Sequence, residues 1–495
     1  MENNQEIELG EIRQKTIYGF LWEFSSKFLE FFVSFIGGLI LVRILEPYDY
    51  GIIALTYIFI RLAGVLTEGG FSRYIVQNKD ADEIDYSTAL LANFSIASIL
   101  YSIIFIAAPF IADFYKEPNL ILLLRVVSLS IIFHSLNIIH LTRLHLDLNF
   151  RFTSLINITS QILSIIIAIV LAYFRFGYWA LVALSLTPSI VAVIYLWFFS
   201  GIKIKFVFSL ERFKKMLNFG KSIIPLDILG IFSLDIYTNM IGKIESTNTV
   251  GIYNRAVQTH GYVTMFVKFP LAKIMNPVFR KIQDNMELVR DTIIRVFEMT
   301  FYINIPLLIL LSVFAEEIFI VLYTAKWLDS VWMFQVLSIG AIISPMNITL
   351  SYVLISIGQS KLFFKVEWTV KILQFIIILI FISSIELMLT GLVVFEFVQV
   401  IVRLYHYKRY LKFDIKTMLD RLRTYAILSI MLLIVNVGLK KIDLTMNIYF
   451  ELTIVLLVNS ITVALYGKAQ RLRPYNDIRD FMLEFAFGIK QKLKI

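Results

Sequence analysis

The amino-acid sequence predicts an all-α polytopic membrane protein with about fourteen transmembrane helices, and three observations carry that prediction. Hydrophobic residues make up 58% and charged residues 17% of 495 positions, against about 45–50% and about 25% in an ordinary globular chain. Apolar runs of roughly 20 residues recur along the whole chain. Lys and Arg concentrate in alternate connecting segments. Together these features exclude a soluble multidomain protein.

Fourteen segments are long and apolar enough to cross the hydrocarbon core, which needs about 20 helical residues. The first six lie near 16–43, 50–72, 86–112, 119–141, 151–174 and 178–199. The next six lie near 217–241, 249–275, 291–322, 330–357, 362–383 and 385–405. A last pair lies near 423–438 and 447–466.

The distribution of positive charge orients these spans. The connecting segments on the side of the N-terminus hold about 28 Lys and Arg, and those on the opposite side about 6. The first apolar segment is too long for a signal peptide, and the acidic start lacks a basic n-region. Both termini are therefore predicted to be cytoplasmic.

Long loops after the sixth and twelfth spans divide the chain as 6 + 6 + 2. This predicts an N-lobe over 1–200, a C-lobe over 201–410, and two additional helices with a basic cytoplasmic tail over 411–495. Weak internal similarity supports a repeat, since Gly51 and Gly251 open the second and eighth spans in similar contexts. Two six-helix lobes in the same orientation enclose a central cavity in transporters of this kind.

Ionisable residues inside the predicted spans are the strongest functional signal, because each costs at least about 2.5–3.5 kcal/mol in lipid and is expected to face protein or water. Those in the first, second, seventh and eighth spans are Glu23, Lys27, Glu30, Arg61, Asp227, Asp235 and Arg255. Glu23, Lys27 and Glu30 share one helix face. Further along lie Lys365, Glu367, Lys371 and Glu396.

Each of these signals also has a structural explanation. Glu23, Lys27 and Glu30 can form a self-neutralising triad, and Lys365 and Glu367 can extend to the membrane surface from a span end. Arg61 and Arg255 have no acidic residue three or four positions away. A pair between Arg61 and Asp235 across the bundle is the alternative to a substrate contact.

Arginine is always charged and its planar fork fits phosphate, so arginines in a cavity favour a phosphate or diphosphate over an organic cation. Arg61, Arg255 and Lys27 are therefore the predicted substrate-binding residues. Glu30, Asp235, Asp227 and Glu23 are the candidates for binding a coupling ion, H⁺ or Na⁺.

Other activities find little support. The chain has no cysteine, and its five histidines lack the spacing of a helical metal pair, so neither a metal site nor a cofactor is expected. Gly220-Lys221-Ser222 lacks the earlier glycine of a P-loop. The net charge of +9 belongs to the cytoplasmic loops, which removes nucleic acid as a partner. The short loops on the outer side argue against an enzyme.

Several local segments resemble the Wzx-type polysaccharide transporters, within the multidrug/oligosaccharidyl-lipid/polysaccharide flippase superfamily. The segments that carry this resemblance are Val42–Gly51, Gly69–Ser72, Ile75–Asp80, Phe114–Pro118, Phe176–Leu181, Gly251–Ala256, Lys326–Leu328 and Ile357–Ser360. Their order and spacing cover most of the chain.

The resemblance implies a flippase that moves undecaprenyl-diphosphate-linked oligosaccharide (an O-antigen, capsule or exopolysaccharide repeat unit) to the outer leaflet of the bacterial cytoplasmic membrane by alternating access. Its partners would be that lipid-linked oligosaccharide, membrane lipids and other polysaccharide-assembly proteins. In such proteins, cationic residues of spans one, two, seven and eight are thought to meet the diphosphate. A multidrug cation/proton antiporter of the same superfamily and a membrane enzyme of glycan assembly are the alternatives.

Overall fold

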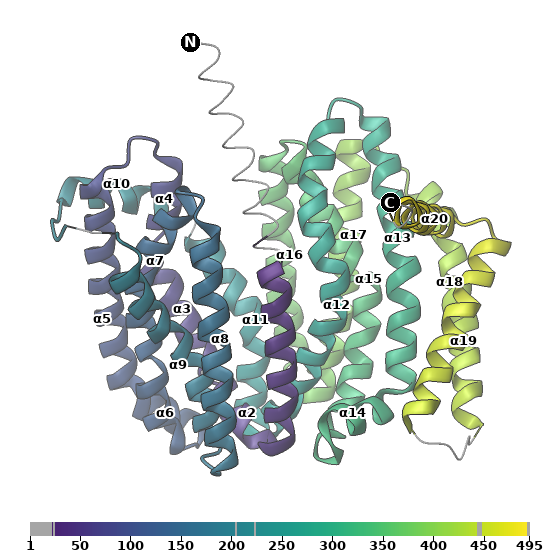
Figure 1. The fold of residues 1–495 in the computed structure, drawn as a ribbon. Helices are drawn as coiled ribbons and strands as arrows, with labels where there is room; N and C mark the ends of the chain where they lie inside the picture. The colour runs from purple at the N-terminus through teal and green to yellow at the C-terminus, as the bar shows by residue number, and fades with distance from the viewer. Residues whose placement is uncertain (1–21, 23–24, 203–204, 222–223, 443–447, 493–495) are drawn as a thin grey trace. The chain divides into compact units, whose positions relative to one another are not determined.

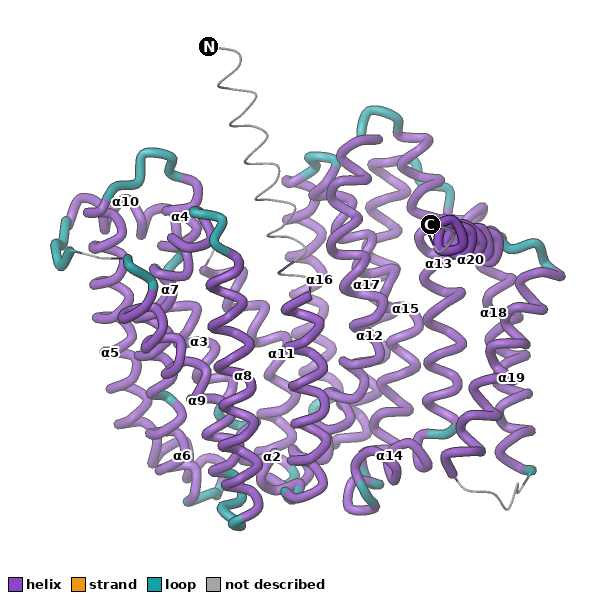
Figure 2. The backbone as a smooth tube through the Cα atoms, in the orientation of Figure 1, coloured by secondary structure: helices purple, strands orange, loops and turns teal. Residues whose placement is uncertain are grey.

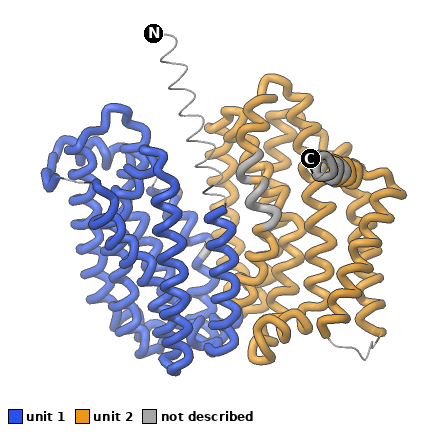
Figure 3. Tube along the Cα trace, in the orientation of Figure 1, with its two compact units in different colours: residues 1–254 blue, residues 255–495 orange. Residues whose placement is uncertain are grey.

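The computed structural model describes all residues except 1–21, 23–24, 203–204, 222–223, 443–447 and 493–495, and the described residues are helices joined by short loops, without strands (Figures 1 and 2). They form two compact units, residues 1–254 and 255–495 (Figure 3). The all-α prediction is confirmed for this part of the chain.

The first unit begins with a helix over 25–44. It continues with α2 (Pro47–Ala54), α3 (Tyr57–Glu68), α4 (Phe71–Gln77), α5 (Glu83–Tyr115), α6 (Asn119–Val127), α7 (Leu129–Leu146), α8 (Phe150–Tyr173), α9 (Trp179–Ile194), a π-helical turn (Tyr195–Phe199), α10 (Leu210–Gly220), α11 (Ile224–Ile244) and the start of α12 (Thr247–Ile282).

The second unit contains the rest of α12. It continues with α13 (Met286–Val313), α14 (Ala315–Tyr323), a short 3₁₀ turn (Ala325–Trp327), α15 (Ser330–Ser356), α16 (Ser360–Phe381), α17 (Ile385–Leu411), α18 (Ile415–Lys441), α19 (Ile448–Ala469) and α20 (Arg473–Lys492).

Within the described residues, ten helical segments are long and apolar enough to cross a membrane. All ten coincide with predicted spans. The other four predicted spans fall on the helix over 25–44 and on α11, α12 and α16. Large apolar side chains point outward from these helices, including Phe110 of α5 and Ile434 of α18. Such exposure suits lipid as the surrounding solvent. The total of fourteen spans stays a prediction.

The predicted span 50–72 is divided among α2, α3 and α4. Gly69 and Gly70 separate α3 from α4, with φ of 56° and 77°. Glycine adopts this left-handed conformation without steric cost, which explains why the chain can turn between two helices there.

Helix ends are capped where the chain enters a span. Asp82 accepts hydrogen bonds from the backbone N–H groups of Ile84 and Asp85, and Asp85 accepts one in return from the backbone N–H of Asp82. Asn285 and Asp414 cap α13 and α18 in a similar way. These side chains satisfy backbone donors that have no partner inside the helix.

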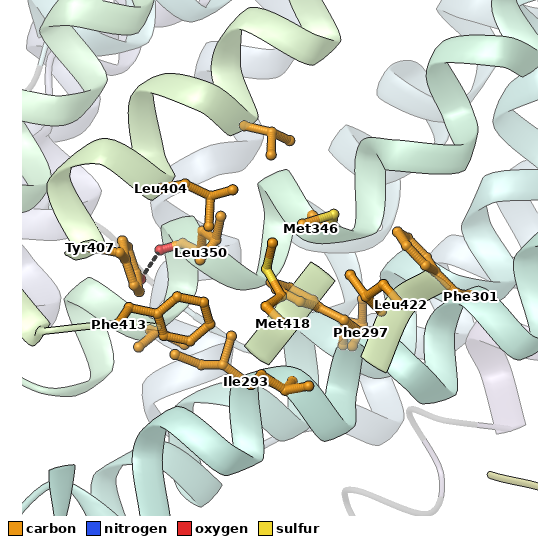
Figure 4. Packing of buried hydrophobic residues seen from close by; sticks show 14 of the residues in the cluster. Ile293, Phe297, Phe301, Met346, Leu350, Leu404, Tyr407, Phe413, Met418 and Leu422 are labelled. Atoms are coloured by element: carbon orange, nitrogen blue, oxygen red, sulfur yellow. Dashed lines mark hydrogen bonds between the residues drawn. The ribbon is translucent and has the colours of Figure 1, made fainter. Parts of the chain in front are cut away.

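The second unit has an extended apolar core, built mainly on α13, α15, α17 and α18 (Figure 4). Phe297, Leu350 and Leu428 are fully buried there. Tyr407 donates its hydroxyl hydrogen to the carbonyl of Leu350, so the one polar atom of its ring is satisfied. This packing holds α15 and α17 side by side, which matters for the polar network described below.

The predicted lobe boundaries stay a prediction, but two observations bear on the arrangement of the elements. Helix α11, placed by the sequence in the C-lobe, packs against α3 and α5 within the first unit. Helix α20 is seen nearly end-on beside the long axes of α18 and α19 (Figure 1). Its start is tied to α13 by ion pairs of Arg295 with Asp477 and Arg473 with Asp291.

Candidate functional site

The helix over 25–44 carries the first pair of predicted site residues. Lys27 Nζ donates to Glu30 Oε2 at 2.8 Å, across one helical turn. About half of the Lys27 side chain is exposed. Glu23 lies outside the described residues. The ammonium group of Lys27 is therefore accessible to an anionic ligand, although the Glu30 carboxylate lies beside it.

Arg61 of α3 and Asp235 of α11 form an ion pair within the first unit. Arg61 Nη1 donates to Asp235 Oδ1 at 2.7 Å. The pairing proposed above as the alternative to a substrate contact is therefore present. The two side chains differ in exposure, because Arg61 is 47% exposed and Asp235 only 10%. The cation is accessible while its counterion is buried.

Neighbouring groups hold this pair in place. The guanidinium of Arg61 lies 5.4 Å from the centre of the Tyr57 ring, one turn earlier on α3. Asn239 donates to the backbone carbonyl of Asp235, and accepts a hydrogen bond from Tyr115 of α5. Asp235 Oδ2 is buried and has no hydrogen-bond partner. One oxygen of the carboxylate is thus committed to Arg61, and the other is available to a proton or a cation.

Asp227 lies two turns before Asp235 on α11 and has a different partner. Its carboxylate contacts Arg73 Nη1 of α4 at 3.1 Å, and both side chains are partly exposed. Exposed pairs of this kind contribute about 0–1 kcal/mol. Asp227 therefore joins α4 to α11 and is separate from the Arg61 pair.

Arg255 belongs to the second unit and is almost fully buried. Its guanidinium lies 5.1 Å from the Tyr323 ring centre and 4.7 Å from that of Trp327, and Nη1 donates to Gln258 at 2.7 Å. Thr259 bonds to the Tyr323 hydroxyl and steadies that ring. Aromatic faces attract a cation, so the two rings hold the guanidinium of Arg255 in place.

A third polar cluster, which the sequence reasoning only half identified, joins α15, α16 and α17. Arg403 Nη2 contacts Glu367 at 2.9 Å, and its Nη1 donates to Asn347 and Gln399 at 3.0 and 2.9 Å. Asn347 also donates to Glu396 at 2.7 Å. Glu367 therefore pairs with a buried arginine and does not extend to the surface.

Arg403 was missed because it lies near the end of an apolar run, where an arginine is expected to extend to the surface. Glu396, Gln399 and Arg403 follow at intervals of three and four, which places them on one face of α17. That periodicity is the signal in the sequence that identifies the cluster.

The fold and these clusters define a multi-pass membrane protein whose charged residues lie among its spans, as in transporters. Residues 40–332, more than half of the chain, match the family described as "Polysaccharide biosynthesis protein". The chain belongs to that family.

Two curated relatives and one solved structure agree with this assignment. The chain is 22% identical to the lipopolysaccharide biosynthesis protein WzxC of Escherichia coli (strain K12) over 360 residues, 72% of either protein. It is 23% identical to the succinoglycan biosynthesis transport protein ExoT of Rhizobium meliloti (strain 1021), over 69% of each. Its fold is similar to that of the lipid II flippase MurJ in an inward closed conformation, with a TM-score of 0.71, 16% identity, and coverage of 93% and 99%.

The resemblance to Wzx-type transporters is thereby confirmed. The chain is a multi-pass bacterial membrane protein of the polysaccharide biosynthesis family. The fold comparison concerns architecture alone, because sequence identity with the solved structure is low.

Proposed function

We propose that this protein is a flippase that moves an undecaprenyl-diphosphate-linked oligosaccharide from the inner to the outer leaflet of the bacterial cytoplasmic membrane by alternating access. Both termini are taken as cytoplasmic, from the distribution of Lys and Arg. The observation that carries the proposal is the Arg61–Asp235 pair, in which a half-exposed arginine is held among apolar helices by a buried carboxylate. Membership of a polysaccharide biosynthesis family supports the kind of cargo.

The diphosphate is proposed to bind Arg61 and Lys27, two cations of the predicted spans whose side chains are about half exposed. A phosphate oxygen accepts hydrogen bonds from a guanidinium in a geometry that a carboxylate also uses. The diphosphate would therefore compete with Asp235 for Arg61. Arg255 is proposed to act through its charge, because its guanidinium is stacked on Tyr323 and Trp327.

The membrane potential can drive the transfer. Moving one charge through 100 mV is worth about 2.3 kcal/mol, so two negative charges leaving a negative interior gain roughly 5 kcal/mol. A coupling ion, H⁺ or Na⁺, is proposed to bind at Asp235, where Oδ2 has no partner. Glu30 is the second candidate, since its Oε1 is also buried without a partner.

The test is transport of a labelled lipid-linked oligosaccharide into the outer leaflet of proteoliposomes, with the wild type, Arg61→Ala and Lys27→Ala. Loss of a hydrogen bond to a charged group costs about 1.5–3 kcal/mol, so Arg61→Ala should slow transport about 10- to 100-fold. Arg61→Lys, which keeps the charge but not the fork, should retain an intermediate rate.

Three results would contradict the proposal. Full transport by both alanine variants at equal protein levels would remove the cationic site. Transport of organic cations by the wild type, with no transport of the lipid, would establish the antiporter. Conversion of the lipid-linked oligosaccharide into a new product would establish an enzyme.

A further inference from the structure

A cavity of about 420 Å³ lies among α15, α16 and α17 of the second unit. Its polar lining includes Asn347, Ser351, Glu367, Gln399 and Arg403. All of these residues except Ser351 belong to the third polar cluster, so the cluster borders an open space as well as joining three helices.

The polar lining is held in a fixed arrangement. Arg403 is bound at three points by Glu367, Asn347 and Gln399, and Ser351 donates to the same oxygen of Glu367 at 3.0 Å. Only 5% of the Arg403 side chain is exposed, and its Nε is buried without a hydrogen-bond partner. An N–H donor left unpaired on a buried guanidinium costs free energy unless something else accepts from it.

The size of the cavity restricts what can fill it. A water molecule occupies about 30 Å³ of the liquid, so this space is much larger than the site of a single bare ion. It falls in the range of about 300–1,000 Å³ typical of small-molecule sites.

The lining also combines two kinds of surface. Tyr352, Phe363 and Ile348 supply ring faces and aliphatic carbon, beside the amides, carboxylates and guanidinium. A pyranose has the same two characters, with hydroxyl groups around its edge and C–H groups on its faces. Amides and carboxylates can satisfy the hydroxyls, each of which would otherwise cost several kcal/mol to remove from water.

The cavity lies near one end of its three helices. Ser351 is five residues before the end of α15, Glu367 seven residues after the start of α16, and Arg403 eight residues before the end of α17. At a rise of 1.5 Å per residue these positions are roughly 7–12 Å from the helix ends. The charge distribution predicts that these ends are cytoplasmic.

We propose that this cavity binds a sugar ring of the transported oligosaccharide on the cytoplasmic side. The inference rests on the proposed function and extends it, because it assigns glycan recognition to α15, α16 and α17 and diphosphate recognition to Arg61 and Lys27. The two sites lie in different compact units, so each can be tested without the other.

The absence of cysteine from the whole chain makes a direct test simple. Ser351→Cys places one thiol in the cavity wall, and Ser246→Cys, at an exposed position in the loop between α11 and α12, is the matched control. Both variants are treated with a water-soluble maleimide in nanodiscs. The two probes are undecaprenyl diphosphate and the free oligosaccharide released by mild acid from the lipid fraction of a strain that lacks this protein.

The free oligosaccharide should slow labelling of Ser351→Cys at least about 10-fold, whereas undecaprenyl diphosphate should leave it unchanged. Neither probe should affect labelling of Ser246→Cys. Equal labelling of Ser351→Cys with and without the oligosaccharide would overturn the proposal, and would show that the cavity holds water only.

A second variant blocks the cavity without deleting any polar group. Ile348→Trp fills the space, and Ile339→Trp places the same side chain on the outward face of the same helix. Ile348→Trp should weaken binding of the free oligosaccharide at least about 10-fold and leave binding of undecaprenyl diphosphate unchanged. Equal oligosaccharide binding by both variants would overturn the glycan site.

Two other results would contradict the proposed function itself. The wild type would bind neither probe, or the deletion strain would accumulate no lipid-linked oligosaccharide. Binding of undecaprenyl diphosphate that depends on Arg61, without any binding of the oligosaccharide, would refute the glycan site alone.

Discussion

Gly51 and Gly251 lie back to back where the first turns of α2 and α12 cross. A Cβ on Gly51 would lie 1.8 Å from the carbonyl oxygen of Thr247, and one on Gly251 would lie 1.8 Å from that of Pro47. Each carbonyl belongs to the residue four positions before the opposite glycine, so the contact is nearly symmetric. Glu117 accepts hydrogen bonds from both Tyr48 and Thr247 beside it. No side chain fits between these backbones.

Alanine at either glycine should therefore force the two helices apart. Overpacking costs about 1–3 kcal/mol, and both Gly51→Ala and Gly251→Ala should reach the upper part of that range because the obstructing atoms are backbone. The apparent melting temperature in detergent measures the effect. Gly261→Ala, on the same helix as Gly251 but with open space around it, should leave the melting temperature unchanged or raise it. A similar fall in all three variants would contradict the crossing.

The Arg61–Asp235 pair should show energetic coupling. Removing Arg61 leaves a buried carboxylate without its counterion, so Arg61→Ala should destabilise the protein more than the double variant with Asp235→Ala. Residues in contact typically couple by about 0.5–3 kcal/mol. The exposure of Arg61 places the expected value near the lower end, about 1 kcal/mol. A thermal double-mutant cycle measures this coupling free energy, and additive effects would show that the two side chains do not interact.

Arg255 should depend on the aromatic faces around it. Arg255→Lys keeps the charge but loses the planar stacking on Tyr323 and Trp327, and should cost about 0.5–2 kcal/mol of stability. Arg280→Lys, at an exposed position of α12, is the control and should be neutral. If both substitutions lower the melting temperature equally, the two rings contribute nothing specific.

Asp82 caps the N-terminus of α5, and we expect this part of the protein to respond to acid. The backbone N–H of Asp85 donates to this carboxylate and, together with the nearby guanidinium of Arg212, lowers its pKa. A lowered pKa in the folded state adds stability at pH values above the ordinary Asp value of about 3.9. That stability is lost as pH falls through the lowered pKa. The Asp82–Arg212 contact joins α10 to α5, so hydrogen exchange in α10 should rise below about pH 4.

The matched variant for this response is Asp82→Asn, which has no charge to lose. Its α10 should exchange faster than that of the wild type at neutral pH, and the additional rise in acid should disappear. An unchanged acid response in Asp82→Asn would assign the effect to another carboxylate.

Much of the fold followed from the sequence because hydropathy is a local property. Lipid offers no hydrogen bonds, so a spanning segment must satisfy its backbone within its own helix, and a run of apolar residues suffices to predict it. All ten apolar spans of the described residues coincide with predicted ones for this reason. The break between α3 and α4 was missed, since it depends on the turn at Gly69 and Gly70.

The candidate site was only partly predictable. The sequence identified Lys27, Arg61, Asp235 and Arg255 as charges among apolar residues, because their cost in lipid is independent of their partners. The partners themselves required the tertiary structure. Asp235 is 174 positions from Arg61, and the contact exists because α3 and α11 pack together.

The sequence by itself determined the class of protein, the positions of most spans and the residues whose charge lipid cannot hold. Only the tertiary structure decided that Arg61 faces a buried carboxylate, that Arg255 stacks on two aromatic rings, and that Glu367 meets Arg403 beside a cavity. The physical reason is the distance along the chain over which each effect acts. Transfer into lipid depends on each segment alone, whereas ion pairs, ring stacking and cavities depend on which helices meet.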